Sequence, residues 1–219
     1  MKLPPLHERL LADILDLGSP YPLVLTGGYA VQAHGLVERF SRDLDVATES
    51  PAPMDEIVAS LTAGLTARGW RIAHVQTDPL GARFLATDPA TGEECEVDVL
   101  REAFWAPPAQ TPYGPVLSLD DVPGTKVRAL ADRGTVRDLI DVQATSRHRS
   151  LADLEALGRR RAHDEFSLED LHDRLTGADW YEDEDYTAYG LTTPQITHLK
   201  TWALHWAQDL ATRIRNTDD

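Results

Sequence analysis

The feature that most constrains the fold is a change in the sequence near residue 118. Before it, short β-like runs alternate with helical stretches, whereas after it the apolar residues recur almost entirely at helical spacing. This order predicts an α+β fold, in which a small mixed β-sheet core flanked by helices precedes a helical C-terminal half. We therefore expect two regions, residues 1–118 and residues 119–219.

Apolar spacing and turn residues predict the individual elements. Helices are expected at residues 5–17, 28–36, 53–68, 119–132, 136–146, 150–162, 167–175 and 193–214. Strands are expected at residues 21–25, 44–47, 70–75, 82–87 and 95–100. Four prolines predict that residues 104–115 form an extended connector. The acidic run from Glu182 to Asp185 is expected to form an exposed loop. Three tryptophans are expected in helix packing or in the core, namely Trp180, Trp202 and Trp206.

Composition narrows the class of protein. No apolar run approaches the roughly 18 residues that a membrane span needs, and the N-terminus lacks the pattern of a signal peptide. Cys95 is the only cysteine, so no internal disulfide is expected. We therefore expect a cytoplasmic protein with no membrane association. The net charge of −15, from 36 acidic and 21 basic residues, disfavours non-specific binding to nucleic acid.

The segment from Leu25 to Val31 contains a strand that ends in Gly27 and Gly28, which open a helix. The first amides of a helix have no partner within it and lie at the positive end of its dipole, so they suit a phosphate. Glycine allows a phosphate to approach the backbone closely because it has no Cβ. A strand followed by two glycines is common, and this pattern alone is a weak signal.

Asp43 and Asp45 follow on a second strand, and because side chains alternate along a strand, both carboxylates lie on one face. A hard divalent cation relieves their mutual repulsion, and magnesium is commonly held by one or two carboxylates plus substrate phosphates. Asp98 lies on a later strand, between apolar Val97 and Val99, where burial of an unpaired carboxylate is costly. It is a candidate third metal ligand or a base for the incoming hydroxyl, and an exposed strand face is the alternative.

This combination resembles the polymerase-β-like nucleotidyltransferase superfamily, and within it the AbiEii/AbiGii-type toxins of bacterial toxin–antitoxin systems. Ser41 occupies the position of the family's Ser or Thr two residues before the first aspartate. The family's Lys-x-x-Ala-Leu-x-x-Arg helix matches residues 126–133, and its Arg-Asp-Leu-x-Asp segment matches residues 137–141. The match in order covers residues 24–142.

The resemblance implies a role for each of these residues. Residues 1–118 would form the nucleotidyltransferase core, with the nucleotide at Gly27, Gly28 and Ser41, and Mg²⁺ or Mn²⁺ at the aspartates. Residues 119–219 would complete the active site, with Lys126 on the phosphates and Arg133 either assisting it or pairing with Asp138. The family's late aspartate corresponds to Asp138 or Asp141, and the spacing does not decide between them.

The implied activity is transfer of a nucleoside monophosphate from a nucleoside triphosphate to an acceptor hydroxyl, by the toxin of a type IV toxin–antitoxin system. The resemblance implies tRNA as acceptor and a cognate antitoxin as partner, although the acidity of the chain is a poor match to RNA. Two alternatives stay open. One is a small-molecule transferase of the aminoglycoside-modifying kind, and the other is a nucleotide-binding module without catalysis.

Overall fold

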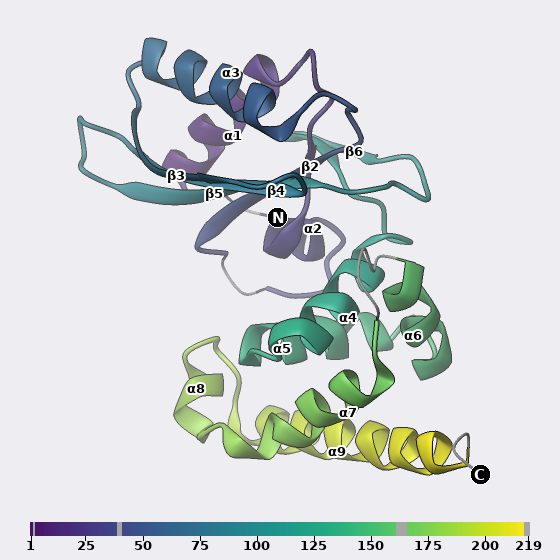
Figure 1. Cartoon of the computed structure of the whole chain (residues 1–219). Helices are drawn as coiled ribbons and strands as arrows, with labels where there is room; N and C mark the ends of the chain where they lie inside the picture. The colour runs from purple at the N-terminus through teal and green to yellow at the C-terminus, as the bar shows by residue number, and fades with distance from the viewer. Residues whose placement is uncertain (2, 39–40, 161–165, 217–219) are drawn as a thin grey trace. The chain divides into compact units, whose positions relative to one another are not determined.

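The computed structural model of the protein describes residues 1, 3–38, 41–160 and 166–216. The chain divides into two compact units, Met1–Leu119 and Asp120–Asp219 (Figure 1). The described strands all belong to the first unit, and the described part of the second unit is helical. The expected α+β class is confirmed.

The first unit is built on a seven-stranded mixed sheet with the strand order β3-β4-β5-β2-β1-β7-β6. The strands are β1 (Val24–Leu25), β2 (Asp43–Thr48), β3 (Arg71–Thr77), β4 (Gly81–Thr87), β5 (Glu94–Arg101), β6 (Ala109–Thr111) and β7 (Gly114–Val116). Strand β2 lies at the centre, antiparallel to β1 and parallel to β5. A central strand is paired along both edges, so its backbone is held firmly on both sides.

Helices cover both faces of this sheet. Helices α1 (Pro5–Leu17) and α3 (Met54–Ala67) lie on one face, and the short helix α2 (Gly27–Ala33) lies on the other (Figure 1). The apolar residues of α1 and α3 recur every three or four positions, and this stripe is buried, as at Ile14 and Leu61.

The second unit consists of helices arranged around α4 and α9. They are α4 (Val122–Arg133), α5 (Val136–Ser146), α6 (Leu151–Arg160), α7 (Leu168–Thr176), the 3₁₀ helix η1 (Gly177–Trp180), α8 (Asp183–Thr187) and α9 (Thr193–Arg215). Trp206 is fully buried, and its Nε1 donates a hydrogen bond to Oε1 of Glu155 at 3.0 Å. Arg213 donates two further hydrogen bonds to that carboxylate, so the buried charge is compensated.

Three local expectations were wrong. Residues 104–115 contain β6 and most of a hairpin with β7, because Thr111 binds Gly114 across a turn in which Gly114 has a φ of +112°. The acidic run forms the start of α8, since Glu182 and Asp185 make a reciprocal capping box at its N-terminus, where acidic side chains are favoured. Trp180 is 80% exposed rather than packed in the core.

The other expected elements are present with boundaries shifted by a few residues. Helix α6 ends at Arg160, and the final two residues of the expected helix, 161 and 162, lie outside the described residues. Phe40, beside the aspartate motif, also lies outside them. Among the residues that the structure describes, no helix has the length and apolar character required to cross a bilayer.

Candidate functional site

Gly27 begins α2 in a conformation that other residues rarely adopt, with a φ of +59°. The backbone amide of the preceding Thr26 donates to the carbonyl of Asp45 at 2.8 Å. A Cβ placed on Gly27 would lie 1.7 Å from Oδ2 of Asp45. The carboxylate of Asp45 therefore lies directly against the Gly27 backbone, at the start of the helix, and no side chain fits between them.

Asp43 and Asp45 lie on one face of β2, and both are half-buried. The Ser41 hydroxyl donates to Oδ1 of Asp43 at 2.7 Å, which orients that carboxylate. Oxygen ligands are those that magnesium and manganese prefer, and an outer hydrogen bond that orients a ligand is typical of metal sites. The oxygen donors of Asp43 and Asp45, with Asp43 oriented by Ser41, are therefore of the kind that a divalent cation takes.

Asp98 lies beside Asp45, because β2 and β5 are paired in the register that places Asp45 opposite Asp98. Both of its carboxylate oxygens accept hydrogen bonds from Arg83, each at 2.7 Å. Arg83 also lies 3.2 Å from Glu96, and its hydrogen bonds to Asp98 raise the pKa of its guanidinium. In the described ranges, no three acidic, histidine or cysteine side chains are grouped to hold one ion. The structure therefore brings Asp98 next to Asp45 but pairs its carboxylate with Arg83.

A buried chain of hydrogen bonds links His7 and Tyr29 to Ser41, the residue that binds Asp43. Nδ1 of His7 lies 2.5 Å from the Tyr29 hydroxyl, which donates to the Ser41 carbonyl at 3.3 Å. Burial raises the pKa of Tyr29 well above its usual value, and the negative charge of Asp43 adds to this effect. Burial also lowers the pKa of His7, although Asp43 opposes the shift. Neutral, buried His7 and Tyr29 thus hold the segment that carries Ser41.

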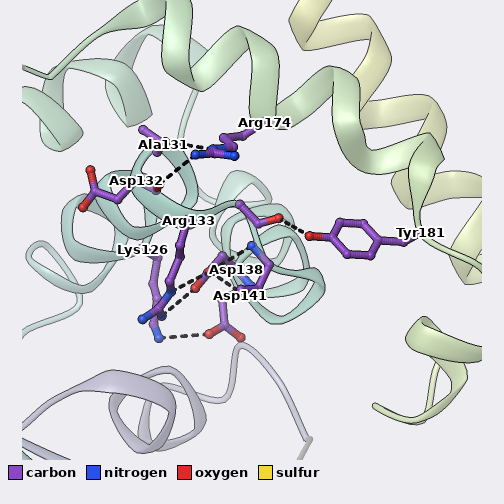
Figure 2. Close-up of polar contacts among 10 residues, drawn as sticks. Lys126, Ala131, Asp132, Arg133, Asp138, Asp141, Arg174 and Tyr181 are labelled. Carbon is purple, nitrogen blue, oxygen red and sulfur yellow. Dashed lines mark hydrogen bonds and ion pairs between the residues drawn. The ribbon is translucent and has the colours of Figure 1, made fainter.

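In the second unit, Lys126 on α4 and Asp141 on α5 form a buried ion pair (Figure 2). Nζ of Lys126 lies 3.0 Å from Oδ2 of Asp141. Lys126 is 5% exposed and Asp141 is fully buried. Breaking such a pair by removing one partner leaves an uncompensated charge in a low-dielectric interior, which costs about 3–5 kcal/mol.

Asp138 is held by a different set of partners at the start of α5 (Figure 2). Arg133 donates to both of its carboxylate oxygens, at 2.8 and 2.9 Å, and Asp138 forms a reciprocal capping box with Thr135. Burial alone would raise the pKa of Asp138, but the Arg133 hydrogen bonds and charge, with Thr135 and Lys126, lower it overall. The two late aspartates therefore differ, since Asp138 caps a helix and Asp141 pairs with Lys126.

Within each unit, the predicted residues fall into contacting groups. The first group lies around the start of α2 and β2 and contains the contacts Gly27–Asp45 and Ser41–Asp43. The pairs Lys126–Asp141 and Arg133–Asp138 form the second, at the junction of α4 and α5.

Three neighbours of the predicted site residues were not anticipated from the sequence, namely His7, Tyr29 and Arg83. Arg83 had a readable signal, because it lies directly opposite Asp98 in the β4–β5 hairpin. His7 had none, since its contact with Tyr29 spans 22 residues of chain.

A helix start built on two glycines, set against paired aspartates on the next strand, defines a core of the nucleotidyltransferase type. The chain also matches the family of AbiEii nucleotidyl transferase toxins, from type IV toxin–antitoxin systems, over residues 9–210. It therefore belongs to this family of nucleotidyltransferase toxins, as the sequence motifs indicated. No significant match was found among curated protein sequences.

The solved structures that are similar in fold include two that cover most of the chain. One is JHP933 from Helicobacter pylori, at 18% identity, with 99% of this chain and 98% of that chain covered and a TM-score of 0.53. The other is MenT4, a nucleotidyltransferase toxin from Mycobacterium tuberculosis, at 20% identity, with 93% and 83% covered and a TM-score of 0.57. At this level of identity the likeness establishes the fold.

Proposed function

We propose that the protein transfers a nucleoside monophosphate from a nucleoside triphosphate to an acceptor hydroxyl, with release of pyrophosphate and with Mg²⁺ or Mn²⁺ as cofactor. The observation that carries this proposal is the contact between Gly27 and Asp45, with Asp43 on the same strand face. This arrangement supports the proposal because carboxylate oxygens are ligands that Mg²⁺ prefers and the first backbone amides of a helix suit a phosphate.

In this proposal, Asp43 and Asp45 hold the divalent cation, and Ser41 keeps Asp43 in the orientation needed for ligation. The cation would offset the negative charge that develops on the transferring phosphate. The triphosphate would lie against the backbone of Gly27 and Gly28. Asp98 would act as a third carboxylate ligand or as the base only after Arg83 releases it, because both of its oxygens accept hydrogen bonds from Arg83 in the structure.

The second unit contributes positive charge in this proposal. Lys126 would act on the triphosphate, with Asp141 as the buried partner that orients its ammonium group. Arg133 is the more exposed cation, with 47% of its side chain accessible, so it can also reach a phosphate while Asp138 orients it. Asp138 would act by orienting Arg133 and would not itself take part in the reaction.

For the acceptor we propose tRNA, and for a partner the cognate antitoxin that the type IV toxin–antitoxin family implies. Nucleoside triphosphates and tRNA are cytoplasmic, so the proposed reaction belongs in that compartment. One observation favours a different acceptor, a small hydroxylated cation such as an aminoglycoside. The net charge of −15 attracts such a molecule and repels RNA.

The experiment compares nucleoside triphosphates labelled at the α-phosphate with the same compounds labelled at the γ-phosphate. Each is incubated with Mg²⁺ and one acceptor, either total tRNA or an aminoglycoside panel. Label entering tRNA from the α-position alone supports nucleotidyl transfer to RNA. Label entering the aminoglycosides instead would support the second acceptor. Absence of transfer to either, together with retained nucleotide binding, would contradict the enzymatic proposal and favour a binding module.

A further inference from the structure

The second unit contains a cavity of about 540 Å³ that the proposed reaction does not use. It is formed by α7, η1 and the turn between α4 and α5, with the lining residues Gly134, Asp173, Arg174, Thr176, Gly177, Trp180 and Tyr181. Trp180 is 80% exposed. Its indole both lines the cavity and is open to solvent, so a ligand in the cavity can contact it.

The walls of this cavity are fixed by hydrogen bonds (Figure 2). The Tyr181 hydroxyl donates to the Gly134 carbonyl at 2.9 Å, and Arg174 donates to the carbonyls of Ala131 and Asp132 at 3.3 and 3.0 Å. The charge of Arg174 is thus directed to the carbonyl end of α4, where cations are favoured. The cavity is therefore a preformed feature in which this arginine already has a structural role.

The surroundings of the cavity are strongly acidic. Residues 168–187 contain one basic residue, Arg174, and eight acidic residues: Glu169, Asp170, Asp173, Asp179, Glu182, Asp183, Glu184 and Asp185. The side chain of Asp173, which lines the cavity, is 78% exposed, although its Oδ1 contacts Nδ1 of His172. The side chain of Asp183 is 55% exposed, although it pairs with Lys200. Such a field repels phosphates and attracts cations.

We propose that this cavity binds a basic segment of a protein partner, with one arginine or lysine side chain over the indole of Trp180. A cation above a tryptophan face is attracted by the ring, by about 0.5–2 kcal/mol depending on desolvation. Asp173 supplies the counter-charge at the cavity, and the acidic residues of η1 and α8 attract the rest of the segment. Charge complementarity selects a basic peptide over RNA as the occupant.

This binding role is distinct from the proposed catalysis, and the turn between α4 and α5 links the two. Gly134 lines the cavity and stands between Arg133 and Thr135, both of which bind Asp138. An occupant therefore rests against the turn that orients Arg133. This gives a basic partner a direct route to influence the α4–α5 junction.

The test uses the full-length protein and a fluorescein-labelled hexa-arginine peptide, followed by fluorescence anisotropy. Trp180→Ala should weaken binding about 2- to 30-fold, the range that the cation–π energies correspond to. Asp173→Lys should weaken it further. Two matched controls leave binding close to wild type: Trp105→Ala, at another exposed tryptophan, and Asp55→Lys, which makes the same charge change on α3.

Equal weakening by Asp55→Lys and Asp173→Lys would overturn the proposal, because binding would then follow net charge alone. Unchanged affinity in Trp180→Ala would also overturn it. A parallel titration with labelled tRNA addresses the other occupant. Loss of tRNA binding in Trp180→Ala, with peptide binding retained, would assign the cavity to RNA and contradict the proposal.

Discussion

Oδ2 of Asp45 occupies the space that a side chain at Gly27 would need, only 1.7 Å from the ideal position of a Cβ. Gly27 begins α2 two residues after β1 ends, and Asp45 lies within β2, which runs antiparallel to β1; the Thr26 amide donates to the Asp45 carbonyl. The glycine is therefore required for two reasons, its φ of +59° and the contact with the carboxylate. These two requirements can be separated experimentally.

Gly27→Ala should reduce nucleotidyl transfer by about 100-fold or more, because a displacement of about 1 Å at a reacting centre has an effect of this size. The left-handed φ should also destabilise the fold by about 1–2 kcal/mol. Gly92→Ala is the matched control, since Gly92 has a φ of +75° and open space around its Cβ position. It should show the stability loss but full activity. Equal activity in the two variants would contradict the proposed contact.

The Arg83–Asp98 pair predicts an effect on metal affinity. Arg83→Gln should tighten Mn²⁺ binding measured by electron paramagnetic resonance, because it removes a nearby positive charge and frees Asp98 for ligation. In an Asp98→Asn background the same change should have a much smaller effect. An identical gain in both backgrounds would show that Asp98 never enters the metal site.

Because Lys126 and Asp141 form a buried pair, we expect substitutions at the two residues to have non-additive effects on the free energy of unfolding. Lys126→Met should lower the free energy of unfolding by about 3–5 kcal/mol, because the buried carboxylate of Asp141 loses the ammonium group of Lys126. Combining it with Asp141→Asn should recover a large part of this loss, as chemical denaturation would show. Transfer activity should stay absent in the double variant, since the ammonium is missing. Activity that returns with stability would remove Lys126 from the reaction.

Asp138 predicts a dependence of stability on pH. Its pKa is lowered in the folded protein, so its ionised form stabilises the fold above the unfolded pKa, and this contribution is lost as pH falls through the folded pKa. Asp138→Asn should therefore be less stable than wild type by about 1–2 kcal/mol at about pH 7. The difference should shrink below about pH 4. A difference that grows on acidification would contradict the assignment.

The local patterns of the sequence predicted the start of α2 and the aspartate strand because both depend on short-range features. Two glycines after an apolar run define the first, and alternation of acidic and apolar residues defines the second. The T-x-x-D pattern of Thr135 and Asp138 was also readable as a capping box. It would have separated the roles of the two late aspartates before the structure was known.

Other contacts depend on tertiary packing and had no local signal. His7 in α1 meets Tyr29 in α2 across 22 residues of chain, a contact that only the tertiary fold creates. Trp180 is exposed because η1 ends at that residue and the chain continues in extended conformation, so helical periodicity no longer applies. The burial of such a residue is decided by how its helices pack, which composition does not specify.

The most direct test of the central claim is pyrophosphate release by wild type, Asp43→Asn and Asp45→Asn in the presence of nucleoside triphosphate, Mg²⁺ and total tRNA. Asp55→Asn, at an exposed carboxylate on α3, is the matched control. We expect release from wild type and Asp55→Asn and none above background from the other two, whose folds should stay intact by circular dichroism. Undiminished release from folded Asp43→Asn and Asp45→Asn would contradict the assignment of these aspartates to the metal site.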